Sequence, residues 1–319
     1  MNIGIACDKN YLFLYKSMLR SLAENNRHIK DGINVYFLNS DLSVDELQAF
    51  VDWCNSIGIN LKRVKIDSDI FPKDIDYDYN QTFKLVMYYR LLLPFVIPED
   101  VDRILYLDGD MIINGSIEEL YKTDFKNKMV VAAPDFVLYN CDNLKKSVNL
   151  PQDYIYFNAG MLLLNITEIR NKLSVDDIFK CARTIQENMR YGDQDILNVL
   201  FHSKVKYVSM PQYNLQLCWH TRTINNSSLK KYDTRIIHFL YKRKPDDYLF
   251  ANPLKKQFWK YTRMNGYLGQ YLLFRVINPI TTLLWNLYIK IKHTEKDFEI
   301  DYSKFEKLAL SERHIDKWD

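Results

Sequence analysis

The sequence is poor in glycine and has no closely paired cysteines. Only 9 of its 319 residues are Gly, which excludes a collagen-like or glycine-rich low-complexity chain. The cysteines are far apart, and no two form a Cys-x-x-Cys pair. This spacing suits neither a disulfide framework nor a cysteine zinc site, and it favours a reducing compartment. The five are Cys7, Cys54, Cys141, Cys181 and Cys218.

The sequence also lacks a large excess of charge of one sign and long apolar runs. The formal net charge is +3, which gives no general reason to expect a nucleic-acid partner. The most apolar stretch, Val276–Ile289, contains Asn278 and Pro279 and is shorter than the roughly 20 residues that span a bilayer. Met1–Ala6 lacks the basic-then-apolar plan of a signal peptide and is interpreted as a strand. We therefore expect a cytoplasmic protein.

Apolar and aromatic residues are abundant. Hydrophobic residues make up 47% of the chain, enough for a large core, so disorder is excluded. Aromatic residues make up 14%, with 23 Tyr. Such rings pack against sugar C–H groups and hydrogen-bond at their edge, although a Tyr-rich core is the alternative.

Short β-rich runs alternate with helical stretches through the first two-thirds of the chain. The clearest helix covers Val44–Ile57, opened by a capping-box pattern, and a second covers Thr82–Leu93 and stops at Pro94. This alternation predicts an α/β fold with a mostly parallel central sheet and helices on both faces. Ligands bind such sheets beyond the carboxyl ends of the strands. The expected strands are Asn2–Ala6, Ile33–Asn39, Leu61–Ile66, Arg103–Leu107, Val130–Ala133 and Met161–Leu164.

The composition changes after about Pro253. From Leu254 to His293 the chain has seven Lys or Arg, many aromatic residues, and no Asp or Glu. We therefore expect a catalytic domain over 1–253 and a C-terminal helical region over 254–319. A basic, aromatic, acid-free helix pair suits the surface of an anionic membrane. A helix packed on the domain is the alternative.

Arg103–Met111 is the most informative stretch, because a buried strand runs straight into Asp108-Gly109-Asp110. Side chains alternate along a strand, so the two carboxylates point to one side, where they repel unless a cation lies between them. Oxygen ligands select hard cations such as Mg²⁺ or Mn²⁺, which can hold and neutralise a leaving diphosphate. Ile at positions 112 and 113 excludes an EF-hand loop.

Further polar residues fall at element ends or inside apolar helices. Asp8 and Asn10 follow the first strand, where they could bind a uracil or ribose. A capped turn before the next helix is the alternative. Arg90 sits in an apolar helix and needs an ion-pair partner or an anionic ligand. Asn158 and Ala159 stand with Gly160 ahead of an apolar strand, and small residues let a ligand approach the backbone.

Two later stretches complete the set. Asp193 opens a helix and is a plausible N-cap, which leaves Gln194 and Asp195 unexplained. A short β-like run ends in His238 and, within a basic cluster, Lys244. Imidazole is an acceptable third ligand for Mn²⁺, and a lysine binds phosphate as a point charge. A structural histidine and a solvated basic loop are the alternatives.

These motifs, in this order, resemble glycosyltransferase family 8, which includes glycogenin and bacterial lipopolysaccharide galactosyltransferases. The resemblance extends from about Met1 to Pro245 and implies a single-domain GT-A fold. It implies a UDP-sugar donor and a metal, usually Mn²⁺ with Mg²⁺ as the alternative, bound by Asp108, Asp110 and His238. It implies uridine contacts at Ala6, Asp8, Asn10 and Tyr11, contacts to the diphosphate at Arg90 and Lys244, and further nucleotide-sugar contacts at Gly109, Asp135, Asn158, Ala159, Asp193 and Gln194.

Two residues depart from the family pattern. Tyr241 stands where a Gly usually follows the metal-binding histidine by three residues, and Asp246 stands where Trp usually follows Lys-Pro. The first departure bears on how the diphosphate is held. The second bears on the closing loop.

The family retains the anomeric configuration, so we expect transfer of galactose or glucose from a UDP-sugar to a glycan or lipid-linked saccharide. Gln194 is the candidate to shield the far face of the sugar cation and Asp193 to orient sugar hydroxyls. A lipopolysaccharide or capsule intermediate at the inner face of a bacterial membrane fits the basic C-terminal region, and we expect no nucleic-acid partner.

Two alternatives compete with this interpretation. An aspartate-nucleophile phosphatase also carries Asp-x-Asp after an apolar strand, but normally on the first strand of its fold. A non-catalytic sugar-nucleotide or glycan-binding subunit is the second alternative, and Tyr241 leaves room for it.

Overall fold

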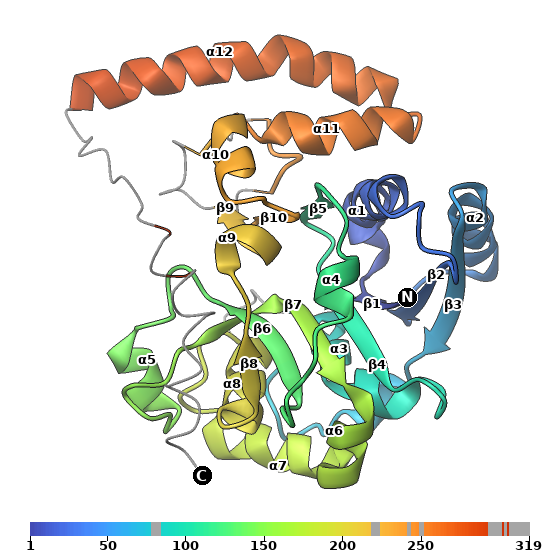
Figure 1. The fold of residues 1–319 in the computed structure, drawn as a ribbon, viewed down its shortest axis with the longest axis vertical. Coiled ribbons are helices and arrows are strands. Elements are labelled where there is room, and N and C mark those ends of the chain that lie inside the picture. Colours follow the sequence, from blue (N-terminus) through green and yellow to red (C-terminus); the bar gives the residue numbers. More distant parts are fainter. Residues whose placement is uncertain are drawn as a thin grey trace.

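A seven-stranded sheet of order β3-β2-β1-β4-β7-β6-β8 forms the centre of the computed structural model (Figure 1). The model describes residues 1–77, 84–217, 224–240, 244–248, 252–292, 302 and 305. Four of the six pairings between these strands are parallel, and both pairings of β7 are antiparallel. The strands are β1 (Asn2–Ala6), β2 (Ile33–Asn39), β3 (Ile59–Lys65), β4 (Arg103–Leu107), β6 (Val130–Pro134), β7 (Phe157–Asn165) and β8 (Val205–Tyr207).

Helices cover both faces of this sheet, and the alternation of side chains explains why. In β4, Leu105 and Leu107 join the core shared with α1, whereas Ile104 and Tyr106 join the core shared with α3. The helices of the first core are α1 (Leu12–Asn25), α2 (Val44–Ser56) and α4 (Glu118–Tyr121). Those of the second core are α3 (Leu85–Val96), α5 (Asp142–Ser147), α6 (Ile166–Lys172), α7 (Val175–Ile185) and α8 (Asp193–Phe201). Two 3₁₀ helices, η1 (Lys9–Tyr11) and η2 (Ser68–Ile70), contribute no buried residue.

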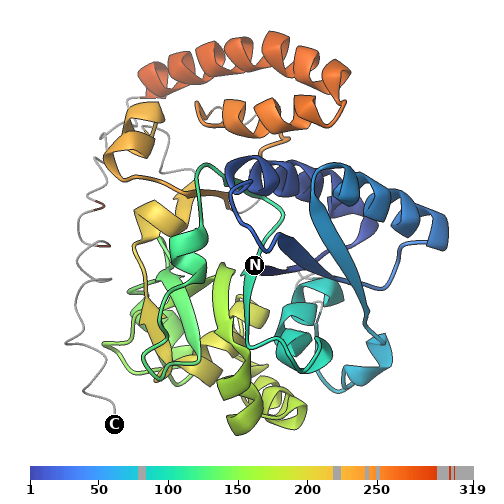
Figure 2. The ribbon, with the colours of Figure 1, turned by 45° about the vertical axis from the view of Figure 1, so that its right-hand side comes forward.

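A second, three-stranded sheet of order β5-β10-β9 stands beside the first (Figure 2). β10 pairs antiparallel with β5 and places His238 opposite Met111, directly after the Asp-Gly-Asp motif. The backbone N–H of Phe239 donates to the carbonyl of Asp110 at 3.0 Å. This small sheet therefore brings His238, which lies 128 positions after Asp110 in the sequence, to the carboxyl end of β4. Its elements are β5 (Met111–Ile113), α9 (Met210–Tyr213), β9 (Leu215–Leu217), α10 (Asn226–Lys231) and β10 (Ile236–Phe239).

The expected α/β architecture is confirmed, and two local predictions need correction. The capping box at Ser43 and Glu46 is present. The second helix, however, continues through Pro94 to Val96, because the Arg170 side chain donates to the carbonyl oxygens of Pro94 at 2.6 Å and Ile97 at 2.7 Å. These bonds satisfy carbonyls that a helix end leaves open. Thr82 lies outside the described residues.

The second correction concerns β7, which begins at Phe157 and not at Met161. Asn158 and Ala159 therefore lie inside this strand and not ahead of it. Phe157 pairs with Pro134 across a register shift in β6, and this pairing extends the strand over the polar residues.

The C-terminal region forms α11 (Lys255–Met264) and α12 (Leu268–Lys292). α11 packs on α1, where Ser17 and Thr262 share a hydrogen bond of 2.9 Å, so the packing alternative holds for this helix. α12 lies on the outer side of α11 (Figure 1). No helix among the described residues is both long and apolar enough to cross a bilayer.

Candidate active site

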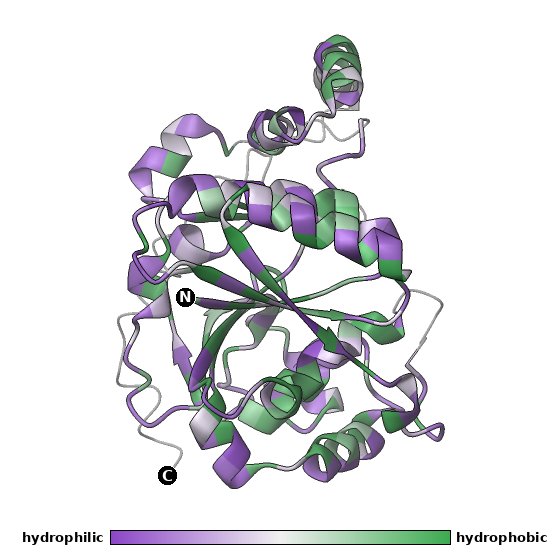
Figure 3. Ribbon diagram, turned by 90° about the vertical axis from the view of Figure 1, so that its right-hand side faces the viewer, coloured by the Kyte–Doolittle hydropathy of each residue, from purple (hydrophilic) through white to green (hydrophobic). Residues whose placement is uncertain are grey.

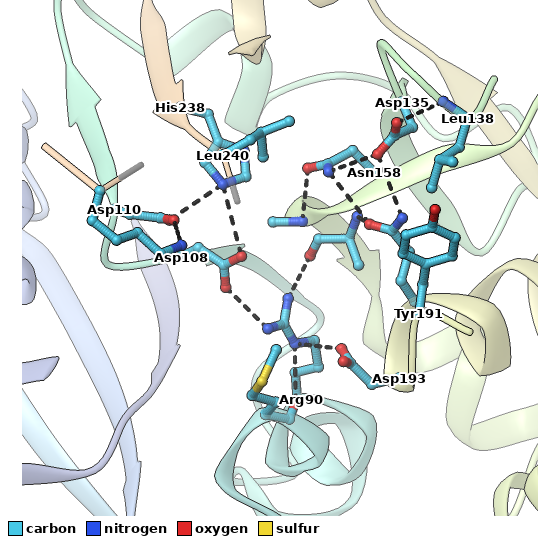
Figure 4. A pocket seen from close by; sticks show the side chains of 15 residues that line it. Arg90, Asp108, Asp110, Asp135, Leu138, Asn158, Tyr191, Asp193, His238 and Leu240 are labelled. Carbon is cyan, nitrogen blue, oxygen red and sulfur yellow. Dashed lines mark hydrogen bonds and ion pairs between the residues drawn. The ribbon is translucent and has the colours of Figure 1, made fainter. Parts of the chain in front are cut away.

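Asp108, Asp110 and His238 meet at the carboxyl end of β4, as the sequence predicted (Figure 4). One ligand atom from each lies within 4.8 Å of the others. The Nε2 atom of His238 lies 3.2 Å from Asp110 and 4.0 Å from Asp108. Three side chains from two sheets thus converge on one point.

The orientation of His238 depends on Asn214, which sequence reasoning missed. The Oδ1 atom of Asn214 lies 3.0 Å from Nδ1 of His238, and its Nδ2 donates to Asn158 at 3.1 Å. Asn214 is fully buried. Its oxygen accepts a hydrogen bond from Nδ1–H in the tautomer that leaves the lone pair of Nε2 facing the carboxylates. A lone Asn between a short helix and a strand gave no signal in the sequence.

Gly160 keeps the space that this cluster occupies. A Cβ atom at this position would lie 2.4 Å from Cε1 of His238 and 2.8 Å from Oδ2 of Asp108. The sequence suggested that a small residue here lets a ligand approach the backbone. The structure shows in addition that the two side chains of the cluster need the space.

The donor set fits a divalent cation. Two carboxylates and one imidazole suit Mn²⁺ or Mg²⁺. The pocket around them has a formal charge of −2 when the histidine is neutral, which a divalent ion balances. The charged residues are the aspartates 108, 110, 135 and 193 and the cations Arg90 and Lys244.

Lys244 forms an ion pair with Asp110 in this structure. Burial favours the neutral carboxyl, but Lys244 and His238 outweigh it and lower the pKa of Asp110. Burial likewise opposes the charge on Lys244, and Asp110 outweighs it and raises the pKa of the lysine. Both groups are therefore charged at neutral pH and lie at one edge of the pocket.

Arg90 has the partners that its burial demands. Its guanidinium lies 3.1 Å from Asp108 and 2.8 Å from Asp193, and it donates to the carbonyl oxygen of Ala159 at 2.8 Å. It also lies 4.5 Å above the centre of the Tyr106 ring. The ion-pair alternative is therefore true, and the same contacts fix the guanidinium between the metal ligands and α8.

Asp193 is the first residue of α8, and Gly192 occupies the N-cap position. The prediction of an N-cap at Asp193 is therefore wrong, because the carboxylate turns towards Arg90. Burial raises the pKa of Asp193 to about 6, although the guanidinium acts in the opposite direction. Its Oδ2 atom is buried, and the Nε atom of Arg90 lies 2.8 Å from it. Such a carboxylate is typical of functional sites.

A polar network joins β7 to α8 on the far side of the pocket. Asn158 donates to Asp135 at 3.0 Å, and Gln194 accepts from the backbone N–H of Ala159 at 2.9 Å. Gln194 also donates to Asp135 at 3.4 Å. Asp195 instead accepts from Arg190, Tyr191 and Tyr156 and belongs to the framework.

The end of β1 forms the other side of the site. Ala6, Asp8 and Tyr11 line a second cavity, and Asp8 also caps η1 by accepting from the N–H of Tyr11 at 3.2 Å. Lys84, which the sequence interpretation did not include, lies 2.8 Å from Asp8. Asn10 is exposed and lines neither cavity.

The two cavities adjoin along the Asp-Gly-Asp motif. Both are lined by Arg90, Asp108, Asp110 and Lys244, and they hold about 600 and 620 Å³ of space. Gly109 lines the second, where an added Cβ would lie 2.5 Å from the Tyr15 ring. Adjoining cavities that share charged side chains are typical of small-molecule sites, in which a few polar groups orient the ligand.

Of the two residues that depart from the family pattern, the structure describes only Asp246. Tyr241 lies outside the described residues. Asp246 is half-buried, and that burial raises the pKa of its carboxyl.

The family model of glycosyl transferase family 8 matches residues 2–248. The chain belongs to this family. Its Asp-Gly-Asp motif therefore lies within a domain of this family, and the phosphatase alternative is abandoned. A putative glycosyltransferase of Haemophilus influenzae is 30% identical over 217 residues, which is 66% of this chain and 62% of that protein. Lipopolysaccharide 1,3-galactosyltransferase of Salmonella typhimurium is 27% identical over 271 residues, 81% of this chain and 76% of that protein.

A solved structure supports the fold assignment. The galactosyltransferase LgtC, in complex with donor and acceptor sugar analogs, matches with a TM-score of 0.68 at 22% identity, over 84% of this chain and 96% of that one. The fold is therefore of the GT-A type, as the resemblance implied. The chain spans 45%, 62% and 61% of the length of the first three curated relatives.

Proposed function

We propose that this chain transfers galactose or glucose from a UDP-sugar to a saccharide or lipid-linked saccharide, with Mn²⁺ and with retention of the anomeric configuration. The observation that carries the proposal is the pair of adjoining cavities with shared charged residues. One cavity follows β1, where a nucleotide fits, and the other reaches Asp193 and Gln194, where a hexose fits. The diphosphate would then lie at the shared wall.

The residues at that wall suit a diphosphate that gains charge as it leaves. Asp108, Asp110 and His238 would hold the metal, which would neutralise the leaving diphosphate. Lys244 is close enough to exchange its ion pair with Asp110 for one with a phosphate oxygen. Arg90, fixed by two carboxylates, presents a positive charge beside the same wall.

The other cavity suits a hexose. The buried Oδ2 of Asp193 is paired with Arg90 at 2.8 Å, and the carboxylate has further lone pairs that accept a hydrogen bond from a sugar hydroxyl in this cavity. Gln194 is held by Ala159 and Asp135, which fixes its amide on the sugar side. We assign Asp193 to the orientation of sugar hydroxyls and Gln194 to the far face of the sugar cation.

The acceptor proposal draws on the C-terminal region and on one relative's name. The Salmonella relative is a lipopolysaccharide galactosyltransferase. We propose that residues 1–253 form the catalytic domain, and that the basic region from residue 254 attaches it to the inner face of a bacterial membrane, where lipid-linked saccharides are presented.

A hydrolysis screen tests the catalytic proposal. UDP-galactose, UDP-glucose and UDP-N-acetylglucosamine are incubated with the full chain, with and without Mn²⁺, and UDP release is measured. We expect Mn²⁺-dependent release from one of the two hexoses and roughly 1000-fold less from Asp110→Asn. Full activity of Asp110→Asn, or no metal dependence, would contradict the proposal. UDP-sugar binding without hydrolysis or transfer would favour the binding-subunit alternative.

A further inference from the structure

The two C-terminal helices are fastened to the molecule in different ways. Phe258 and Trp259 of α11 are buried against α1. α12 instead rests on α11, where Phe274 stacks on Trp259 at 5.1 Å between ring centres. Two views place α12 at the outer edge of the molecule (Figures 1 and 2). Its other face is therefore turned away from the protein.

That outward face is apolar. Its side chains are between 48% and 69% exposed and recur every three or four residues, so they share one side of the helix over about 30 Å. Hydrophobic residues are visible along this outermost helix in Figure 3. An exposed apolar surface of this extent marks an interaction site. The apolar stripe consists of Leu268, Leu272, Leu273, Val276, Ile280, Leu283, Leu284 and Leu287.

A basic cleft borders the stripe. Lys256, Lys260 and Arg263 project from α11 with helical spacing, and Arg275 faces them from α12. None of these four cations forms an ion pair with a carboxylate of the described residues. The segment from 254 to 293 contains no Asp or Glu. Among the described residues, the cleft therefore carries positive charge that no carboxylate balances.

The two arginines converge on Tyr271. The guanidinium of Arg263 lies 5.2 Å from the centre of its ring, and Arg275 donates to its hydroxyl at 3.3 Å. The bond from Arg275, together with the charge of both arginines, lowers the pKa of the Tyr271 hydroxyl. The Oδ1 atom of Asn278, which also lines the cleft, is buried without a hydrogen-bond partner among the described residues.

We infer that the basic cleft binds the phosphate of an anionic phospholipid while the apolar stripe lies among the acyl chains. The inference rests on the proposed membrane attachment and names the site that makes it. Arg275 and the stripe both belong to α12, so one helix presents a phosphate ligand on one side and acyl contacts on another. Guanidinium groups bind phosphate through paired hydrogen bonds. A phospholipid joins the same two chemistries, a charged phosphate and apolar chains, in one molecule.

Charge favours this occupant over a second copy of the chain. Two copies that paired through their stripes would bring two basic clefts near one another, and residues 254–293 of each copy contain no Asp or Glu to balance them. An anionic bilayer supplies both the negative charge and the apolar layer.

Vesicle sedimentation with the full chain tests the inference. The vesicles contain phosphatidylcholine alone or phosphatidylcholine with phosphatidylglycerol. We expect strong binding only to the second kind. Arg263→Gln/Arg275→Gln should weaken that binding roughly 25-fold, about fivefold for each charge removed. The matched control, Lys73→Gln/Lys180→Gln, removes the same charge from exposed positions outside the C-terminal helices and should bind like the parent chain.

A second pair of substitutions separates the cleft from the stripe. Val276→Gln/Leu283→Gln removes two exposed apolar side chains and should lower binding to every vesicle. Competition by inorganic phosphate distinguishes a lipid from a free phosphate as the ligand, and we expect it to be weak. Equal binding to both kinds of vesicle, an equal loss in the control pair, or dimers that the Gln substitutions dissociate would overturn the inference. UDP-sugar hydrolysis by the same variants, measured without vesicles, reports separately on the proposed function.

Discussion

Arginine and lysine are used differently at the active site and in the C-terminal basic cleft. At the site, Arg90 and Lys244 are held by carboxylates, and the guanidinium of Arg90 is almost fully buried. In the cleft, Arg263 and Arg275 are exposed and contact the Tyr271 ring and hydroxyl. Buried, paired charges hold their geometry before a ligand arrives, which catalysis requires. Exposed, unpaired charges adapt to a fluid surface, which a membrane presents.

Of the substitutions discussed here, Gly160→Ala should cause the largest loss of activity. It tests how rigid the active site is. The added methyl group overlaps with His238 and Asp108, so one of them must leave the cluster. We expect Mn²⁺-dependent hydrolysis of the UDP-hexose to fall by more than about 100-fold. Gly269→Ala in α12 is the matched control, because its added methyl group meets nothing within 4 Å. Similar losses in both variants would contradict the structural reason.

Asp193→Asn tests whether the buried charge of Asp193 lowers the stability of the folded protein. The pKa of the Asp193 carboxyl is about 6 in the folded protein and 3.8 in the unfolded chain. Between these values the folded state binds more protons, so its stability falls as the pH rises. Asn does not titrate. We therefore expect the free energy of unfolding of the variant, relative to the parent chain, to rise by about 3 kcal/mol from about pH 4 to about pH 7.

Urea unfolding at several pH values measures this difference. Asp100→Asn, at an exposed position, is the matched control. Parallel pH profiles for the parent chain and Asp193→Asn would show that Asp193 is not held in the way that its burial implies.

Asn214→Ala examines the support behind the metal ligands. The variant loses the contact with Nδ1 of His238, and we expect the affinity for Mn²⁺ to fall about 10- to 100-fold. Calorimetry with Mn²⁺ alone measures this directly. Asn26→Ala is the control, because Asn26 is equally buried but bonds to Leu22 and Ile117, away from the site. It should lose stability and keep its affinity for Mn²⁺, whereas an unchanged affinity in Asn214→Ala would refute the role of Asn214.

Arg263→Gln/Arg275→Gln should have the smallest effect on the isolated enzyme. Both side chains are exposed and pair with no described carboxylate, so the free energy of unfolding should change by no more than about 0.5 kcal/mol. Hydrolysis of the UDP-hexose without vesicles should stay within about twofold. A large loss of hydrolysis would mean that the two regions are coupled.

Local patterns predicted much of the fold. The strand at Arg103–Leu107, the capping box before Val44 and the acid-free C-terminal region all depend on residues close together in sequence. Those patterns did not predict that β7 runs antiparallel to its neighbours, because the apolar run Met161–Leu164 that identifies the strand carries no information about its direction.

The active site, too, was predicted in part from local sequence and decided in part by the tertiary structure. The sequence by itself determined that Asp108 and Asp110 follow directly on a buried strand, because the apolar run Arg103–Leu107 is a property of that segment alone. The two carboxylates lie on the turn between β4 and β5, beyond the alternation of the strand. Only the tertiary structure decided that Asn214 turns His238 towards them and that Gly160 leaves the space for both. It also decided that α11 is buried while α12 exposes its apolar face. Such choices depend on which distant surfaces pack together, and the periodicity of a single segment carries no information about its partner.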